Sequence, residues 1–258
     1  MPNLTSLFGV PNPVALVTGA GAPRIGNCVA RCLASRGYQI VIHAHRSQTA
    51  AKETVAELHE QGVSDAWCVV ADLTDEEAVQ RMVQQVRDRF GRVDVLANCA
   101  AIWSPKQLEN ITALDVQQHF EANALSTFLC CQHAGLVMVD QPDGGAIVNL
   151  GDWAVARPYP NYAAYFPSKG AIVALTRSFA VELAARNPKV RVNAVLPGPV
   201  MLPPDLPESD RQTAIQGTLV KREGRPDNVA HAVVFLVEND FVTGVCLPVD
   251  GGRTIYAV

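Results

Sequence analysis

The stretch Val14-Ala15-Leu16-Val17-Thr18-Gly19-Ala20-Gly21-Ala22-Pro23-Arg24-Ile25-Gly26 decides the fold. It opens with a short apolar run that is typical of a buried strand. Glycines follow at once, and the residues from there to Gly37 are rich in Ala, Cys and Leu, as in a helix. Glycines let a backbone turn sharply and approach a diphosphate, and the next helix offers free N–H groups at its N-terminus. We expect this strand, turn and helix to hold a pyrophosphate.

Short apolar runs alternate with longer helical stretches along the whole chain. The pattern predicts strands at residues 14–18, 39–43, 66–71, 93–97, 146–150, 190–196 and 245–249. Besides the helix that follows residue 26, it predicts helices at 49–61, 76–90, 114–139, 162–186 and 228–237. Nearly all-apolar strands separated by helices are typical of a parallel sheet covered on both faces. With right-handed crossovers, we predict a doubly wound (Rossmann) α/β/α fold in one domain, residues 1–258.

One long segment, residues 197–225, lacks clear strand or helix patterning and contains several prolines. Loops of this length in compact domains are usually lids or binding loops. It follows the carboxyl end of a predicted strand, where ligands bind in such sheets. We expect it to be the substrate loop, with Met201, Leu202 and Leu206 against the substrate.

Composition excludes several classes of function. The formal net charge is −4 and the pI is near 5.9, whereas nucleic acid and anionic membrane both require a basic face. No signal peptide is recognisable, and no uninterrupted apolar run reaches the ~20 residues that span a bilayer. The seven cysteines are odd in number and form no CxxC pair, which favours reduced thiols and no metal site. We expect a cytoplasmic protein that binds neither nucleic acid nor membrane.

The end of the second predicted strand indicates which nicotinamide dinucleotide would bind. An acidic residue there would bond the ribose hydroxyls of NAD, but the sequence has His45, Arg46 and Ser47. Arg46, together with Arg24 in the glycine turn, could bind a 2′-phosphate through charge-assisted hydrogen bonds, so we expect NADP(H) rather than NAD. Asp72, with Leu73, either meets the adenine or caps the turn before Thr74; the sequence favours neither.

At this point the chain resembles a short-chain dehydrogenase/reductase over essentially its whole length. The matching segments, in the family's order, are Thr18–Gly26, Asn98-Cys99-Ala100-Ala101, Asn123, Tyr165-Phe166-Pro167-Ser168-Lys169, Pro197-Gly198 and Asp250-Gly251-Gly252. The resemblance implies cofactor contacts from Gly19, Arg24, Ile25, Gly26, His45, Arg46, Ser47, Asp72, Leu73, Asn98, Ala100, Tyr165, Lys169, Pro197 and Gly198. It also implies a homotetramer assembled through the helices at 114–139 and 162–186 and through the C-terminal segment.

Departures from the general family pattern indicate one particular branch of the family. The family has a serine at the position of Asp152, 13 residues before Tyr165. Arg24 stands where the glycine turn normally has a second glycine, in a turn one residue longer than usual, and Trp103 follows the Asn98–Ala101 segment. These features are similar to those of pteridine reductases and alternative dihydrofolate reductases. That branch uses an Asp–Tyr–Lys set, a His-Arg-Ser contact with NADP, as at residues 45–47 here, and an aromatic residue that stacks on the pterin.

Tyr165 and Lys169 are the expected centre of the chemistry. They stand four residues apart in a helical stretch and so share a face. A neighbouring ammonium lowers the pKa of a tyrosine from its ordinary ~10, so we expect Tyr165 to donate a proton near neutral pH. As the family implies, Lys169 would bond the nicotinamide ribose and Asn123 would hold a relay water. Pro167 lies between the pair, and a proline inside a helix costs about 3 kcal/mol unless the helix begins nearby.

Asp152 and Trp103 carry the substrate hypothesis. An ionised carboxylate cannot donate a hydrogen bond to a carbonyl, which argues against simple ketone reduction. Asp152 could instead accept from the amino-pyrimidine edge of a pterin or share a proton with Tyr165, and burial would raise its pKa. Trp103 would stack on the pterin. The alternatives are an Asp152 that caps a turn and a Trp103 that packs at a core edge.

The sequence therefore predicts an NADPH-dependent reductase that transfers hydride to a C=N bond of a pterin or dihydrofolate. Asp152, Tyr165, Lys169 and Asn123 are its expected catalytic residues, and Trp103, Asp152, Tyr165, Met201, Leu202 and Leu206 are expected to contact the substrate. Two alternatives remain open. One is a general carbonyl or 3-oxoacyl reductase or alcohol dehydrogenase of the same fold, and the other is a non-catalytic NADP-binding protein.

Overall fold

A computed structural model of the chain describes residues 3–256. Its seven strands form one parallel sheet in the order β3-β2-β1-β4-β5-β6-β7. The bounds are β1 Val14–Thr18, β2 Gln39–Ala44, β3 Ala66–Val70, β4 Val95–Asn98, β5 Gly145–Leu150, β6 Val190–Pro197 and β7 Cys246–Val249. The order reverses between β1 and β4, which confirms the predicted doubly wound fold.

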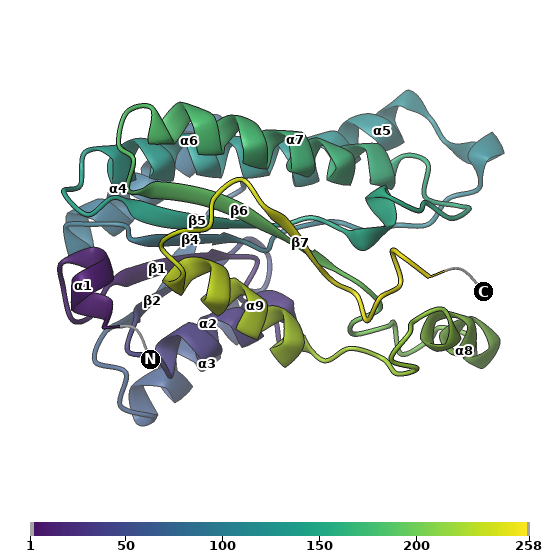
Figure 1. Cartoon of the computed structure of the whole chain (residues 1–258), viewed down its shortest axis with the longest axis horizontal. Coiled ribbons are helices and arrows are strands. Elements are labelled where there is room, and N and C mark those ends of the chain that lie inside the picture. The colour runs from purple at the N-terminus through teal and green to yellow at the C-terminus, as the bar shows by residue number, and fades with distance from the viewer. Residues whose placement is uncertain (1–2, 257–258) are drawn as a thin grey trace.

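Helices cover both faces of the sheet (Figure 1). One layer contains α2 Ile25–Ala34, α3 Gln48–Glu60 and α9 Pro226–Glu238, with the short α1 Leu4–Phe8 beside it. The other contains α4 Glu76–Phe90, α6 Ser126–Val139 and α7 Tyr165–Ala184. Along β1, Ala15 and Val17 pack into the first layer, and Val14 and Leu16 into the second. Burial of both strand faces is the physical reason that the strands are almost wholly apolar.

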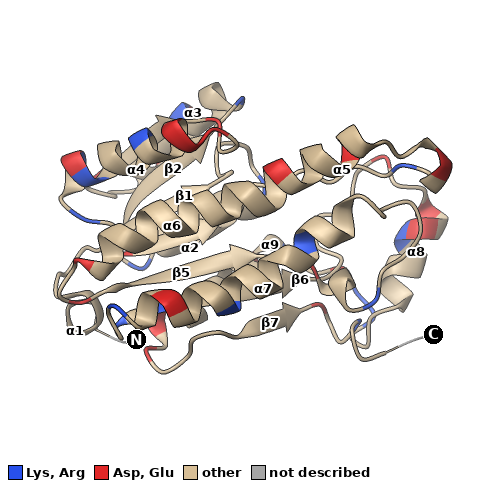
Figure 2. Cartoon of the chain, turned by 90° about the horizontal axis from the view of Figure 1, so that it is seen from above, with Lys and Arg blue, Asp and Glu red and all other residues tan. Residues whose placement is uncertain are grey.

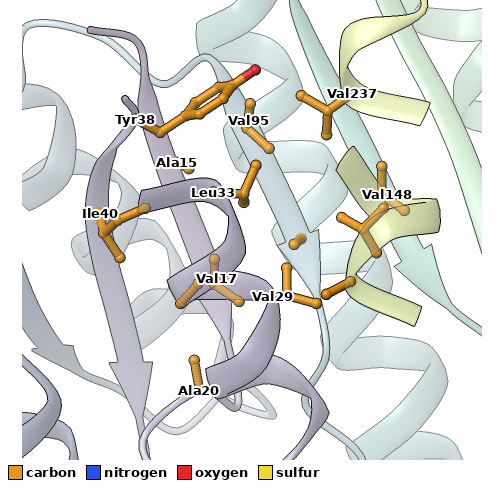
Figure 3. Close-up of a cluster of buried hydrophobic side chains, with 14 of the residues drawn as sticks. Ala15, Val17, Ala20, Val29, Leu33, Tyr38, Ile40, Val95, Val148 and Val237 are labelled. Atoms are coloured by element: carbon orange, nitrogen blue, oxygen red, sulfur yellow. The ribbon is translucent and has the colours of Figure 1, made fainter. Parts of the chain in front are cut away.

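The first layer is locked by interdigitated aliphatic and aromatic side chains (Figure 3). Val29 and Leu33 of α2 lie over Val17 and Val95 of the sheet and are fully buried. The Tyr38 ring closes the end of this core, packed edge-on against Phe8 of α1 at 6.0 Å between ring centroids. This packing fixes α2, and with it the glycine turn that precedes the helix.

The predicted helix at 114–139 is one continuous helical stretch with a defect in its middle. It comprises α5 Ala113–His119, a π-helical turn Phe120–Leu125 and then α6. By length and composition alone, Ala113–Val139 would suffice to cross a membrane, although no apolar run in the sequence suggested it. In this fold α6 packs against α4, α7 and the sheet. A π-helical turn often marks a functional position, and here it contains Asn123.

Two sequence expectations need correction. Residues 197–225 are not an unstructured loop, because they include α8 Glu208–Gln216. None of the residues of α8 is buried, so the helix has no apolar stripe that the sequence could reveal. The predicted helix at 162–186 begins at Tyr165. Pro167 is thus in the first turn, where a backbone N–H has no partner within the helix, and its cost largely disappears.

Candidate active site

The carboxyl ends of β1, β4 and β5 meet at the point where the strand order reverses. There Thr18 pairs with Asn98, and Asn98 pairs with Asn149 across the sheet. The Thr18 hydroxyl accepts hydrogen bonds from the backbone N–H groups of Cys99 (3.0 Å) and Ala100 (3.2 Å). These bonds fix the chain after β4 against the glycine turn.

The glycine turn has no room for side chains. Gly19 has a φ of +62°, and a Cβ on it would lie 2.7 Å from the Ala100 Cα. A Cβ on Gly26 would lie 2.8 Å from the Gly19 carbonyl oxygen. Helix α2 begins at Ile25, and the Arg24 side chain does not cap it, so the first N–H groups of the helix are free for an anion. These features fit the pyrophosphate of a dinucleotide.

His43 is a contributor to this turn that sequence reasoning missed. Its buried ring accepts a hydrogen bond at Nδ1 from the Gly19 N–H (3.1 Å), and its Nε2 lies 3.1 Å from the Ala71 carbonyl oxygen. Burial lowers the pKa of His43 to about 4, so the ring is neutral and Nε2 carries the proton. His43 thereby ties the glycine turn to the end of β3. His43 lies in an apolar strand, and only its polarity in the sequence could have indicated this contact with the glycine turn.

The adenosine end of the site is open and polar. A cavity of about 600 Å³ lies beside the end of β2, and its lining includes His45, Arg46 and Asp72. Arg46 is exposed there, which fits a 2′-phosphate, and the ring of His45 lies 3.9 Å from the Asp72 carboxylate. Asp72 also accepts from the Thr74 N–H (3.0 Å) and hydroxyl, bonds that lower the pKa of Asp72. Asp72 therefore does cap the turn before Thr74.

Asn98 has its side chain directed into the protein interior. Its amide nitrogen donates to the Asn149 side chain at 2.9 Å, and Asn149 in turn donates to the Thr176 hydroxyl at 3.1 Å. Asn98 is 4% exposed. A contact between Asn98 and a cofactor would therefore come from its backbone rather than its amide group.

Asp152, Tyr165 and Lys169 come together as the sequence predicted. The Tyr165 hydroxyl donates to Asp152 Oδ2 at 2.8 Å, while Asp152 Oδ1 accepts from the Ala154 N–H at 2.8 Å. Asp152 therefore both meets Tyr165 and caps the short 3₁₀ helix Trp153–Val155. The ammonium of Lys169 donates to the Leu150 carbonyl at 2.8 Å. Tyr165 and Lys169 are both buried.

The electrostatics of this group differ from the sequence expectation. Burial, and then the charge of Asp152, raise the pKa of Tyr165 well above its ordinary value. Lys169 does not lower it, because the ammonium is directed at Leu150. Burial raises the pKa of Asp152 and lowers the pKa of Lys169 to about 8. Tyr165 is thus a proton donor that holds its proton firmly, next to a carboxyl group whose pKa is raised by burial.

Asn123 fastens the π-helical turn to neighbouring segments. Its side-chain oxygen accepts from the Ile102 N–H (2.8 Å), and its nitrogen donates to the Ile102 carbonyl (3.1 Å) and the Ser168 hydroxyl (3.0 Å). Ser168 donates to the Tyr165 carbonyl at 2.6 Å. Asn123 therefore connects the chain after β4 to the first turn of α7.

An aromatic cluster borders the catalytic group, and the sequence identified only part of it. Trp103 is 40% exposed and stacks on Tyr162, with 5.0 Å between ring centroids and 13° between planes. Tyr162 lies 6.2 Å from Tyr165, and His119 packs edge-on against Tyr165 at 6.1 Å. Tyr159 lies 6.2 Å from Trp153. Tyr159, Tyr162 and His119 were missed because aromatic residues in a loop or helix are usual packing residues.

The predicted substrate loop leaves β6 at Pro197. Gly198 passes close to the C-terminal turn, since a Cβ on it would lie 2.5 Å from the Asp250 Cα. Met201 is exposed with a φ of +55°, and the Leu202 N–H donates to Glu223 at 2.8 Å. Leu206 is half-buried before α8. None of these three predicted substrate residues has a described contact with Tyr165.

With this geometry established, comparison with known proteins is informative. A family model described as enoyl-(acyl carrier protein) reductase matches residues 19–254. A short-chain dehydrogenase/reductase of Aspergillus oryzae is 31% identical, covering 96% of this chain and 97% of its own. A 3-oxoacyl-[acyl-carrier-protein] reductase of Synechocystis is 33% identical, covering 94% of this chain and 97% of its own. The chain belongs to the short-chain dehydrogenase/reductase family and is an oxidoreductase.

A solved structure extends the likeness to three dimensions. The blue fluorescent protein from a metagenomic library, in complex with NADPH, superposes with a TM-score of 0.85 at 31% identity. The match covers 93% of this chain and 97% of that one. The finer resemblance to pteridine reductases rests on this chain's own residues, namely Asp152, Arg24, Trp103 and the segment 45–47.

Proposed function

We propose that the protein is an NADP(H)-dependent reductase of a carbonyl group, with 3-oxoacyl thioesters as the first substrate class to test. The observation that carries this proposal is the buried contact between Tyr165 and Asp152, in a chain whose relatives include 3-oxoacyl reductases. This reverses the preference drawn from the sequence, which placed pterin reduction first.

The reason for the reversal is the protonation state of Asp152. The sequence argument against ketone reduction assumed an ionised carboxylate, which cannot donate a hydrogen bond. Burial raises the pKa of Asp152, and a protonated carboxyl group donates as a serine hydroxyl does. Asp152 can therefore take the role that serine has in the family.

The residues present fit a nicotinamide dinucleotide, and they divide the work of carbonyl reduction. When bound, a nicotinamide dinucleotide would supply the hydride for the carbonyl carbon. Tyr165, which donates to Asp152 in this structure, would donate its proton to the carbonyl oxygen, and Asp152, when protonated, would stabilise the same oxygen or return a proton to Tyr165. Lys169, with a pKa of about 8, can exchange a proton near neutral pH. Arg46 would hold the 2′-phosphate of the cofactor, together with Arg24 of the glycine turn; both side chains are exposed.

The test is NADPH oxidation with a panel of a 3-oxoacyl thioester, simple ketones, dihydrobiopterin and dihydrofolate. The proposal predicts turnover of the carbonyl compounds. Tyr165→Phe should lower kcat by roughly 100-fold or more, since it removes the proton donor, whereas Tyr162→Phe keeps an aromatic neighbour and should retain most activity. Turnover of the pterins alone would reject carbonyl reduction.

A second candidate function is reduction of a pterin or dihydrofolate. Asp152 and the exposed Trp103 favour it, since an ionised Asp152 would accept from an amino-pyrimidine edge and Trp103 presents a flat face. Trp103→Leu separates the two candidates. It should raise the KM for a pterin strongly if the pterin stacks there, and it should change small-ketone reduction little.

We further propose a cytoplasmic homotetramer. Helix α6 carries no charged residue along its outer side, as Figure 2 shows, and Phe128 and Leu136 are exposed on it. Val181 of α7 and Phe241 after α9 are also exposed, by 71% and 98%. Apolar surface of this extent suits contacts between copies of the chain.

A further inference from the structure

The helix of the substrate loop, α8, bonds mainly to its own loop, since Arg211 of α8 pairs with Glu223 at 2.8 Å and donates to the Pro203 carbonyl at 2.9 Å. It has nine residues, none of them buried. Isolated helices shorter than ~12 residues are marginal in water, so α8 depends on contacts with the rest of the protein. Figure 1 shows α8 apart from the sheet, with the C-terminal segment running beside it. The C-terminal turn, residues 250–256, is therefore the place to look for an attachment.

Arg253 of the C-terminal turn makes that attachment. Its guanidinium donates to the carbonyl oxygens of Ala214 and, at 3.4 Å, Thr213, both in the last turn of α8. A cation at the C-terminal end of a helix also has a favourable interaction with the helix dipole. The fit is close, because a Cβ on Gly217 would lie 2.5 Å from Arg253 Nη1.

The other side of Arg253 contacts the Asp152 loop, residues 152–157. Its guanidinium carbon lies 4.8 Å from the centroid of the Trp153 ring, one residue after Asp152. Arg157, from the same loop, donates to the Arg253 carbonyl at 2.7 Å and to the Tyr256 carbonyl. Asp250 orders the turn by accepting from the Gly252 and Thr254 N–H groups. One side chain thus joins the segment that holds Asp152 to the helix of the substrate loop.

We propose that Arg253 is a positioning residue that holds α8, and with it the predicted substrate loop, against the Asp152 loop. Only the assignment of residues 197–225 as the substrate loop rests on the proposed function. The guanidinium touches neither Asp152 nor Tyr165 among the described contacts, so Arg253 acts through α8 and Trp153.

The test is hydrogen–deuterium exchange of the α8 amides in the intact protein. Arg253→Met keeps an unbranched side chain over Trp153 but removes the donors, so α8 should exchange roughly ten-fold faster, the effect of losing a charge-assisted hydrogen bond. Arg186→Met, at an exposed arginine after α7, is the matched control and should leave α8 unchanged. Unchanged exchange in Arg253→Met would overturn the proposal.

Gly217→Ala gives an independent test that leaves Arg253 in place. Gly217 has an ordinary helical φ of −69°, so alanine would by propensity alone stabilise the end of α8 and slow its exchange. The proposal predicts the opposite, because the new Cβ displaces the guanidinium. Slower exchange in Gly217→Ala would count against it.

Kinetics supply the functional readout. In Arg253→Met, the KM for the carbonyl substrate should rise roughly ten-fold, with a smaller change in kcat and an unchanged Kd for NADPH. Equal loss in kcat and kcat/KM, with KM unchanged, would contradict a positioning role in substrate binding. If no carbonyl compound is turned over by the parent protein, the proposed function fails, while the exchange measurement still decides the role of Arg253.

Discussion

We propose that the choice of cofactor depends on Arg46. It is exposed beside the polar cavity at the end of β2, and a guanidinium binds a phosphate bidentately. Arg46→Ala should weaken NADPH binding by roughly 10- to 100-fold, as expected for losing a charged hydrogen-bond partner, and change NADH binding little. Fluorescence titration of both cofactors measures the two affinities. Equal losses for NADPH and NADH would remove the 2′-phosphate assignment.

Lys169 should make the stability of the protein depend on pH. Its pKa is about 8 in the folded protein, against the ordinary 10.5. The unfolded chain therefore binds more protons between these values, and the contribution of Lys169 to the free energy of unfolding rises as pH rises through that window. Below pH 8 the buried ammonium costs about 3 kcal/mol, from 1.36 kcal/mol per pKa unit. The proposed catalytic role of Lys169 would explain why a residue that lowers stability is present.

Denaturant titration of cofactor-free Lys169→Met checks this dependence. The variant should gain stability over the parent protein at pH 7, and the gain should shrink from about pH 8 to 10.5. Arg186→Met, whose side chain is exposed, should follow the pH dependence of the parent protein. A stability difference between Lys169→Met and the parent protein that stays constant over this range would show that the pKa of Lys169 is not lowered.

The sequence predicted which residues meet at the candidate site, but it did not predict their pKa shifts. The spacing of Asp152 and Tyr165 predicted that they meet, and the structure shows the hydrogen bond between them. The direction of the Tyr165 pKa shift was wrong, because it depends on where the Lys169 ammonium points, which spacing does not determine. His43 was missed because its partner, the Gly19 N–H, lies 24 residues away in the chain.

Among the elements, α9 depends on a buried arginine. Arg191 of β6 donates through Nη1 to the Leu236 and Asn239 carbonyls at 2.7 Å and through Nη2 to the Val237 carbonyl at 2.6 Å. It thereby caps the last turn of α9, whose final carbonyls have no helical partners. Leucine in its place would leave these groups unsatisfied.

Arg191→Leu should therefore destabilise the protein by about 3 kcal/mol. For a chain of this length, that corresponds to a fall in Tm of roughly 6–12 °C. Scanning calorimetry measures it, with Arg186→Leu as an exposed control expected to stay within about 0.5 kcal/mol. A Tm within 2 °C of the parent protein, an interval below the roughly 6–12 °C expected, would show that water replaces the arginine.

The strands could be predicted from the sequence, whereas helix α8 could not. Strands buried on both faces have continuous apolar runs, so every strand was found to within a few residues. Helix α8 was not, because without buried residues it has no apolar periodicity, and contacts from Arg253 support it instead. Pro167 would destabilise the interior of the helix predicted at 162–186. Because α7 begins at Tyr165, Pro167 lies in its first turn instead.

The exposed apolar residues of α6 and α7 allow the proposed homotetramer to be tested. If α6, α7 and the C-terminal segment join copies of the chain, sedimentation velocity should give a species of about four times 27.7 kDa. Val181→Glu, which puts a charge on the exposed face of α7, should yield a smaller species with an intact fold by circular dichroism. A parent protein that sediments as a monomer would reject the tetramer.

The proposed reduction of a carbonyl group requires Asp152 to act in its protonated form. The most direct test is the pH profile of kcat/KM for carbonyl reduction by the parent protein and by Asp152→Ser. In the parent protein, kcat/KM should fall as pH rises through the raised pKa of Asp152, because the carboxylate no longer donates. Serine donates at every pH, so Asp152→Ser should stay active without that fall. An inactive Asp152→Ser, or the same fall with pH in both proteins, would contradict the account.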